Sequence, residues 1–177
     1  MEDPGRTPFR IILTGPESTG KTMLCNHLAV WYKGESVPEY AREYVSRLDH
    51  RYTYDDVVHI AEKQLEMMNE YCTHKCNYLF VDTYLIITKV WLMHVFRKVP
   101  GWIGTEISRT HDALYLLCKP DIPWEPDGIR ENGGIMRAIL FEEYRKELHL
   151  AGLRYAYVEG TGMERVNSAI QSIQTYF

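Results

Sequence analysis

The sequence predicts an α/β fold, a three-layer sandwich in which helices cover both faces of a five-stranded parallel sheet. Five short apolar runs alternate along the chain with segments of helical period, and parallel strands need such crossovers. The first run leads into Gly15-Pro16-Glu17-Ser18-Thr19-Gly20-Lys21-Thr22, which fits the phosphate-loop pattern G-x-x-x-x-G-K-[ST] at every fixed position. With the right-handed crossover rule, this predicts the P-loop NTPase sandwich, whose ligands bind at the carboxyl ends of the strands.

The bulk properties indicate one soluble domain. The chain has 177 residues, 45% hydrophobic and 25% charged, which suits a single core. We expect a flexible N-terminus at residues 1–8 and one domain at 9–177. A net charge of −4 argues against a broad nucleic-acid surface, and no apolar run approaches the roughly 20 residues of a membrane span. Without a signal peptide, the four cysteines indicate a reduced, cytoplasmic protein. The oligomeric state stays open.

The first half of the chain is expected to hold three strands. Apolar runs predict strands at 9–14 and 78–82, and Pro38 limits a short edge strand at 36–38. The helices are expected at 23–32, at 39–48, from Asp55 or Asp56 onward, and at 85–96. Helical spacing places the following residues on buried faces: Leu24, Leu28 and Trp31 in the first helix, and Val58, Ala61, Leu65, Met68 and Cys72 in the third.

The second half is expected to hold two strands, at 113–118 and 154–158. A loop rich in Pro and Gly, about 121–135, follows the first of these strands, leads into a helix at 136–148 and has the composition of a lid. A last helix closes the chain. The aligned apolar residues are Met136, Leu140, Tyr144 and Leu148 in the helix at 136–148, and Val166, Ala169, Ile170, Ile173 and Phe177 in the last one.

The phosphate loop predicts ATP binding. Gly15 and Gly20 allow a tight turn whose N–H groups point at phosphate oxygens, and the following helix adds the positive end of its dipole. Lys21 is expected at the β/γ-phosphates, and the Thr22 hydroxyl is a candidate Mg²⁺ ligand. Gly160 and Thr161, after the last strand, are candidates for the rim of the adenine site, although a plain glycine turn explains them equally.

Two carboxylates are candidate catalytic residues. Asp82 ends an apolar strand, where it can hold Mg²⁺ or act on an acceptor hydroxyl; its alternative role is to cap the next helix. Glu39 and Arg42 follow the second strand, where a small-molecule kinase faces its acceptor. Glu39 is a candidate base and Arg42 a candidate ligand of phosphate or of that acid, while the alternative for both is a solvated helix start. Which carboxylate is the base stays open.

The expected lid contains one large aromatic residue, Trp124, in a polar stretch. Gly133-Gly134 provides a possible hinge. Arg130 and Arg137 are candidates to stabilise charge on the transferring phosphoryl group. Trp124 is expected to stack on the acceptor base, with a hydrophobic plug beneath the loop as its alternative.

Four blocks of sequence resemble the ribosylnicotinamide kinase domain of the NadR family. They are the phosphate loop, Pro38-Glu39-Tyr40-Ala41-Arg42-Glu43-Tyr44-Val45, Phe80-Val81-Asp82-Thr83, and Pro123-Trp124 with Asp127-Gly128 and Arg130. The resemblance, from about Arg10 to Ala169, implies a kinase that uses ATP and Mg²⁺ to make nicotinamide mononucleotide from nicotinamide riboside. The residues expected at the acceptor are Glu39, Tyr40, Arg42, Asp82, Trp124 and Asp127.

The chain departs from NadR-type proteins in two respects. Tyr84 stands where they commonly carry a third acidic residue, so a kinase for another heteroaromatic nucleoside or alcohol stays an alternative. An ATP-binding regulatory module with little transfer activity is the second alternative. The chain starts eight residues before its first expected strand, so we expect neither the adenylyltransferase domain nor the DNA-binding domain of NadR proteins.

Overall fold

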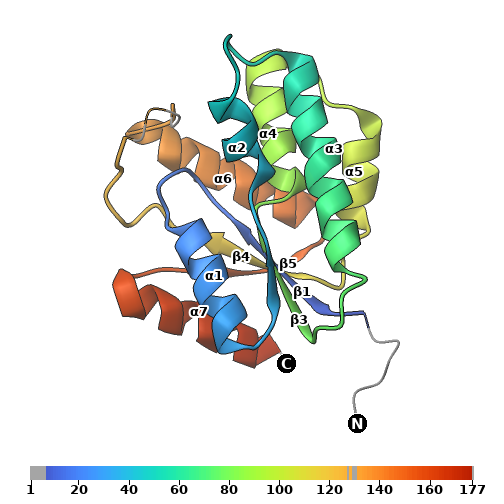
Figure 1. The fold of residues 1–177 in the computed structure, drawn as a ribbon. Helices are drawn as coiled ribbons and strands as arrows, with labels where there is room; N and C mark the ends of the chain where they lie inside the picture. The colour runs from blue at the N-terminus through green and yellow to red at the C-terminus, as the bar shows by residue number, and fades with distance from the viewer. Residues whose placement is uncertain (1–6, 127, 129–130, 177) are drawn as a thin grey trace.

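A five-stranded sheet lies between two layers of helices (Figure 1). The computed structural model describes residues 7–126, 128 and 131–176. The strands are β1 (Phe9–Thr14), β2 (Glu35–Val37), β3 (Tyr78–Asp82), β4 (Leu114–Cys118) and β5 (Arg154–Val158). The helices are α1 (Lys21–Trp31), α2 (Tyr40–Ser46), α3 (Tyr54–Tyr71), α4 (Leu85–Phe96), α5 (Gly101–Ser108), α6 (Ile135–Leu150) and α7 (Gly162–Tyr176). None of these helices is long and apolar enough to cross a membrane.

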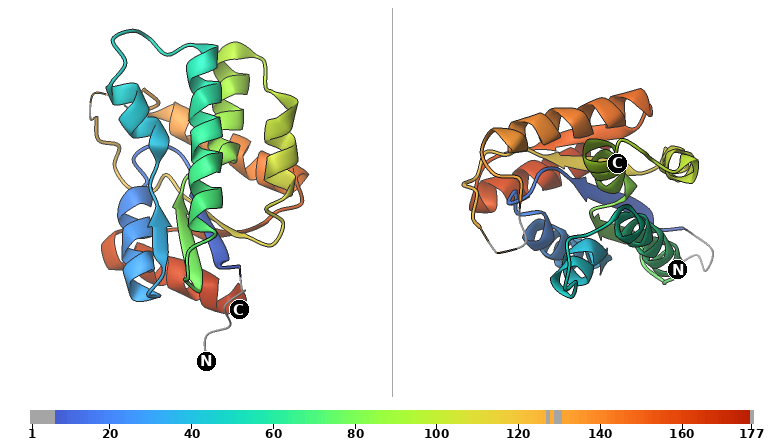
Figure 2. Two further views of the ribbon diagram at one scale, coloured as in Figure 1. Left: turned by 45° about the vertical axis from the view of Figure 1, so that its right-hand side comes forward. Right: turned by 90° about the horizontal axis from the view of Figure 1, so that it is seen from above.

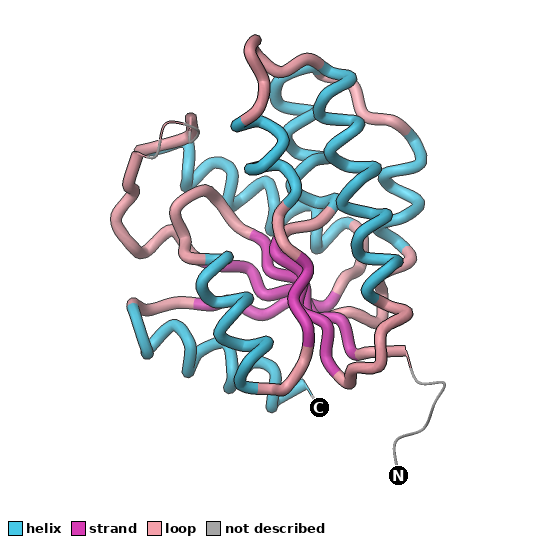
Figure 3. Tube along the Cα trace, viewed as in Figure 1, coloured by secondary structure: helices cyan, strands magenta, loops and turns pink. Residues whose placement is uncertain are grey.

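The sheet is parallel throughout, with the strand order β2-β3-β1-β4-β5. The predicted α/β fold is therefore confirmed. Because all strands run in one direction, the loops after β1, β2 and β3 leave the same edge of the sheet, as Figure 3 shows. The strand order brings these three loops together around β3, which places the phosphate loop beside Glu39 and Asp82.

Each face of the sheet has its own hydrophobic core, because side chains alternate along a strand. Ile11 and Leu13 of β1 face α1 and α7, where they pack with Leu28 and Ile173. Ile12 points the other way into a larger core shared with α3, α4, α5 and α6. Figure 2 shows the two helical layers from further directions.

One helix, α5, is missing from the sequence-based expectation. It has eight residues, begins after Pro100, and contains Gly101 and Gly104, which disfavour a helix. Its buried residues are Ile103 and Ile107, one helical turn apart. Tertiary packing of this single pair against the core overrides the weak local propensity.

Two expected helix faces are also wrong in detail. Trp31 is 61% exposed, whereas Leu24 and Leu28 are buried as expected. Thr53 forms a capping box with Asp56, so α3 begins at Tyr54. Its face is rotated by about one position from the expected one: the residues that it buries are Val57, Ile60, Ala61, Gln64 and Met68.

Candidate functional site

The phosphate-loop sequence forms a tight turn between β1 and α1. Gly15 has φ 140°, and a Cβ placed there would lie 2.7 Å from the carbonyl oxygen of Cys118. Gly20 has φ 73° and precedes the first residue of α1. Both glycines are thus required by backbone conformation, and at Gly15 also by the close approach of β4. The motif therefore lies between a strand and a helix, which is the structural context of a phosphate-binding loop.

Side chains within the loop stabilise its turn. The Thr19 hydroxyl donates to the carbonyl oxygen of Pro16 at 2.9 Å, and the Lys21 ammonium donates to the same oxygen at 2.7 Å. Lys21 therefore lies over its own loop, at the N-terminus of α1, where the helix dipole favours anions.

A cavity of about 720 Å³ extends from the phosphate loop to α4. Lys21 and Thr22 line it at the loop, Glu39 and Arg42 line it after β2, and Thr83 lines it after β3. This volume is within the range of about 300–1,000 Å³ that is usual for small-molecule sites. The structure thus brings most of the phosphate loop and two of the predicted acceptor residues, Glu39 and Arg42, to one cavity, whereas Gly160 and Thr161 are not part of its described lining.

Asp82 lies at the end of β3, opposite Leu13 of β1, and directly precedes Thr83, which lines the cavity. It is 1% exposed, and neither carboxylate oxygen has a hydrogen-bond partner among the described residues. Burial raises the pKa of Asp82, and the Thr22 hydroxyl and the Lys21 ammonium lower it only in part. A buried polar group that lacks a partner is costly, which points to a role with a ligand.

The alternative role for Asp82 is wrong. Tyr84 occupies the N-cap position of α4, and no side chain caps this helix. Thr83, between them, has φ 68°, an unusual conformation for a residue other than glycine.

The donor set around Asp82 fits Mg²⁺. This cation prefers oxygen ligands and is usually held by one or two protein groups together with phosphates and water. Asp82 offers two unsatisfied oxygens close to the Thr22 hydroxyl. The described residues contain no group of three or more His, Cys, Asp or Glu side chains that could hold a metal ion.

Glu39 is the second carboxylate of the site. It occupies the N-cap position of α2 without making a side-chain cap bond, and it is partly exposed to the cavity. Burial raises the pKa of Glu39, while the Lys21 ammonium lowers it and the Asp82 carboxylate raises it further. The Lys21 ammonium therefore lowers the pKa of both carboxylates, of Glu39 after β2 and of Asp82 at the end of β3.

Tyr40 does not lie with these residues. Its ring packs against those of Tyr44 and His59, at centroid distances of 5.8 Å and 6.0 Å, and it is absent from the lining of the described cavity. The expected contact of Tyr40 with an acceptor therefore stays a prediction that this geometry does not support.

Both ends of the expected lid are attached to the phosphate loop. The backbone N–H and side-chain amide of Asn132 donate to the Glu17 carboxylate at 2.9 Å and 3.1 Å. The Ser18 hydroxyl donates to the carbonyl oxygen of Pro123 at 3.3 Å and accepts from the N–H of Glu125 at 3.1 Å. Variable positions of the motif thus couple the lid to the nucleotide site.

Arg137 strengthens this attachment. It is 7% exposed, and its guanidinium donates to the carbonyl oxygens of Ile122 and Ser18 at 2.8 Å and 3.0 Å. These bonds make Arg137 a clamp between lid and loop, and they give no support to its expected contact with the transferring phosphoryl group. Two other expected residues, Asp127 and Arg130, lie outside the described residues.

Trp124 lies within the lid. A Cβ added at Gly133 would lie 3.2 Å from its ring carbons, and its indole nitrogen is buried without a partner among the described residues. Trp124 is not part of the described cavity lining. Of the two interpretations that the sequence left open, this geometry favours the plug.

The aromatic wall of the cavity comes from residues that the sequence did not single out. The rings of Tyr52 and Trp91 meet edge to face, with centroids 4.8 Å apart, and both line the cavity. The Tyr52 hydroxyl donates to the Glu131 carboxylate at 2.9 Å. Trp91 looked like a core residue because α4 is apolar on every side, and Tyr52 lies in a short polar turn, so neither carried a usable signal.

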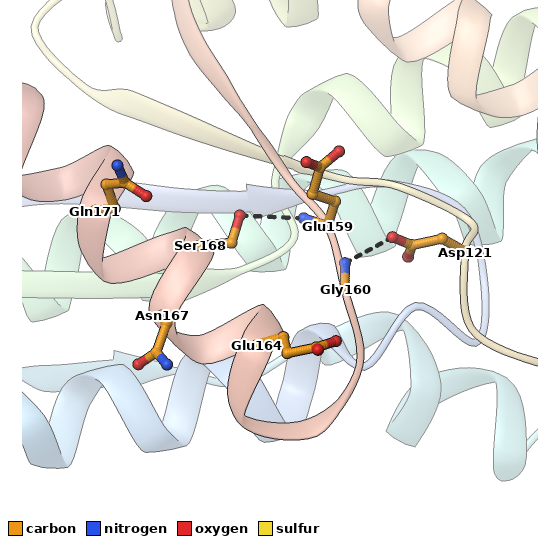
Figure 4. A pocket seen from close by; sticks show the side chains of 7 residues that line it. All are labelled: Asp121, Glu159, Gly160, Glu164, Asn167, Ser168 and Gln171. Carbon is orange, nitrogen blue, oxygen red and sulfur yellow. Dashed lines mark hydrogen bonds between the residues drawn. The ribbon is translucent and has the colours of Figure 1, made fainter.

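A second, more open pocket of about 570 Å³ lies beside the loop that follows β5. Figure 4 shows Asp121 accepting from the N–H of Gly160, at 2.8 Å, and Ser168 accepting from the N–H of Glu159. Arg165, 5% exposed, pairs with Asp121 and so ties the ends of β4 and β5 to α7. Gly160 borders this pocket, whereas Thr161 is not part of its described lining and donates its N–H to the Glu164 carboxylate at 3.3 Å. Their expected place at the adenine site stays a prediction.

Comparisons with known proteins agree with this geometry. Two curated relatives are trifunctional NAD biosynthesis/regulator proteins NadR: 25% identical over 142 residues in Salmonella typhimurium, and 27% identical over 127 residues in Escherichia coli. The matches cover 78% and 70% of this chain but 35% and 31% of the relatives, so the chain spans about a third of their length.

Solved structures show the same fold. A NadR protein in complex with NR matches with a TM-score of 0.74 and 20% identity, over 96% of this chain and 51% of that one. A deoxyadenosine kinase from M. mycoides matches with a TM-score of 0.65 and 10% identity, over 94% of this chain and 100% of that one. The resemblance to NadR that the motifs indicated is confirmed. A family model described as an AAA domain matches residues 10–165, and the chain therefore belongs to this AAA domain family.

Proposed function

We propose that the chain is an ATP-dependent kinase that transfers the γ-phosphoryl group to a hydroxyl of a small nucleoside, and that nicotinamide riboside is its acceptor. One observation carries the proposal. A single cavity joins the phosphate-loop residue Lys21, the carboxylate of Glu39, and an aromatic wall of Tyr52 and Trp91. Phosphate binding, proton acceptance and recognition of a flat ring are the three tasks of a nucleoside kinase.

The phosphoryl end of the site relies on the loop and α1. Backbone N–H groups and the helix N-terminus bind phosphate oxygens, and Lys21 follows the negative charge of the transferring group. Thr22 and Asp82 would hold Mg²⁺, which when bound neutralises charge on the β- and γ-phosphates. The pocket bordered by Gly160 would hold the adenine ring beyond the phosphates.

The acceptor end relies on Glu39. A carboxylate with a raised pKa is a better proton acceptor than an ordinary one, provided that it is ionised at the working pH. Asp82 is not part of the described cavity lining, and its two carboxylate oxygens, close to Thr22, have no hydrogen-bond partner among the described residues. We therefore assign the acceptor hydroxyl to Glu39 and the cation to Asp82.

The comparisons support the choice of acceptor. The relatives named for NAD biosynthesis match along most of this chain, and a NadR structure of the same fold contains NR. The Tyr52–Trp91 wall suits a flat ring, and the nearby carboxylate of Glu131 suits a positive one such as pyridinium. Activity toward another nucleoside remains the main alternative, because solved deoxyadenosine kinases share the fold.

The test is ADP release by the purified chain with Mg²⁺ and ATP, alone and with each of three acceptors: nicotinamide riboside, an uncharged ring analogue, and deoxyadenosine. We expect slow hydrolysis without acceptor, strong stimulation by nicotinamide riboside, and nicotinamide mononucleotide in the mass spectrum. Stimulation by deoxyadenosine alone would identify a different nucleoside kinase. Equal, slow turnover under every condition would instead favour the regulatory module.

A further inference from the structure

A buried glutamine interrupts the apolar face of α3. Gln64 is 3% exposed and lies on the same helical face as Ile60, Ala61 and Met68. Placing an amide among apolar residues is unfavourable unless each of its polar ends finds a partner. The position of Gln64 therefore calls for a reason outside the packing of α3 itself.

Both ends of the Gln64 amide bind the backbone on either side of Glu39. The N–H of Tyr40 donates to Oε1 of Gln64 at 2.9 Å, and Nε2 of Gln64 donates to the carbonyl oxygen of Pro38 at 3.2 Å. The reverse orientation of the amide would set donor against donor and acceptor against acceptor. One side chain thus holds both peptide groups that flank the candidate base.

The segment around Glu39 connects two short elements at an edge of the sheet. β2 is an edge strand of three residues, and α2 is a helix of seven residues, none of them buried. The Glu39 side chain makes no cap bond that would orient it. In Figures 1 and 2, α2 lies beside α3. From α3, Gln64 bonds the backbone at the start of α2, whereas His59 and Asp56 contact only the side-chain hydroxyls of Tyr40 and Tyr44.

We propose that Gln64 is a positioning residue, which holds the backbone at 38–40 so that the Glu39 carboxylate faces the cavity beside Lys21. The inference rests on the proposed kinase function, because it assigns Gln64 an effect on transfer through Glu39. Gln64 borders the same cavity, but both ends of its amide are engaged by the backbone.

The experiment is a double-mutant cycle with Gln64→Leu and Glu39→Gln, using nicotinamide riboside as the acceptor. Leucine suits the apolar face of α3 but can hold neither Pro38 nor Tyr40. We expect Gln64→Leu to lower kcat at least about tenfold with the KM for ATP unchanged, because the phosphate loop is untouched. In the Glu39→Gln background, the same substitution should lower kcat no further, because residues that act as a unit are not additive.

Met68→Leu is the matched control, since Met68 is 2% exposed, one turn further along the same face, and is not part of the described cavity lining. It should leave kcat unchanged. Equal losses from Gln64→Leu in both backgrounds would show a general structural effect and overturn the inference, as would full activity of Gln64→Leu.

A readout without activity separates this inference from the proposed function. Crystal structures of the wild-type chain and of Gln64→Leu should differ in the position of the Glu39 carboxylate, whichever acceptor the protein uses. An unmoved Glu39 overturns the inference. If no acceptor is phosphorylated but Glu39 moves, the positioning role stands and the kinase proposal fails.

Discussion

Asp82→Asn should make the protein more stable and less active, because the buried charge of Asp82 lowers stability but is needed for phosphoryl transfer. The substitution keeps the shape of the side chain and removes its negative charge. An unpartnered buried polar group costs about 1–3 kcal/mol and a charged one costs more, so the neutral amide of Asn is cheaper to bury than the Asp82 carboxylate, whose oxygens have no partner among the described residues. We therefore expect Asp82→Asn to raise the free energy of unfolding by about 1 kcal/mol, or Tm by about 2–4 °C for a chain of this size.

The sign of the pH dependence follows from the raised pKa of Asp82. A raised pKa means that the folded protein disfavours the carboxylate, so the charge lowers stability at any pH above the pKa of the unfolded chain, about 3.9. The stability advantage of Asp82→Asn should be full only above the raised pKa of the folded state. It should shrink as the pH falls toward about 4, where the wild-type group becomes neutral in both states.

Activity should fall in the same variant by about 10²–10³-fold, the usual effect of losing one electrostatic contact to developing charge. The assays are coupled ADP release and thermal denaturation with and without Mg²⁺ and a non-hydrolysable ATP analogue, which should stabilise the wild-type chain more than the variant. Asp55→Asn, an exposed carboxylate change, is the control and should retain full activity. An Asp82→Asn protein that is less stable and equally active would refute the reasoning.

Two further substitutions test neighbouring parts of the site. Lys21→Ala should lower the rate of phosphoryl transfer by orders of magnitude while the fold is retained. Lys33→Ala, on the exposed turn after α1, is the control and should leave this rate unchanged. Near-normal turnover of folded Lys21→Ala would disprove the phosphate-loop assignment. Trp124→Leu should lower Tm by several degrees, because the Trp124 ring packs on Gly133, and should change the KM for the acceptor little. A raised KM for the acceptor with an unchanged Tm would instead support stacking of Trp124 on the acceptor base.

The regular elements could be predicted where the periodicity was strong. The bounds of the strands β1, β3 and β5 agree with the expected ones to the residue, because apolar runs that end in polar or glycine-rich turns mark strands well. The bounds of the helix α4 also agree. The phosphate loop was equally predictable, since its glycines are demanded by backbone conformation. By contrast, α5 depends on one buried pair, which no local pattern reveals.

The acceptor side of the site was less predictable, because its residues depend on tertiary contacts. Gln64 looked like an ordinary polar residue of a surface helix until α3 packed against the start of α2. Trp91 lies in a helix that is apolar all round, so periodicity could not separate its cavity face from its core face. Trp124 drew attention because no periodic pattern surrounds it, yet its half-buried ring lies against Gly133 of the same loop.

The two carboxylates differ in how firmly the fold holds them, and this difference bears on specificity. Asp82 ends β3, which pairs with β1 on one side and β2 on the other, so its position is set by the centre of the sheet. Glu39 follows the short edge strand, and the peptide groups on either side of it are held by Gln64, which accepts from the Tyr40 N–H and donates to the Pro38 carbonyl oxygen. Small changes around Gln64 can therefore shift the acceptor carboxylate while the cation and phosphate residues stay in place. A change of acceptor in related chains should then arise at the β2–α2 junction and the Tyr52–Trp91 wall, with the chemistry at Lys21 and Asp82 retained.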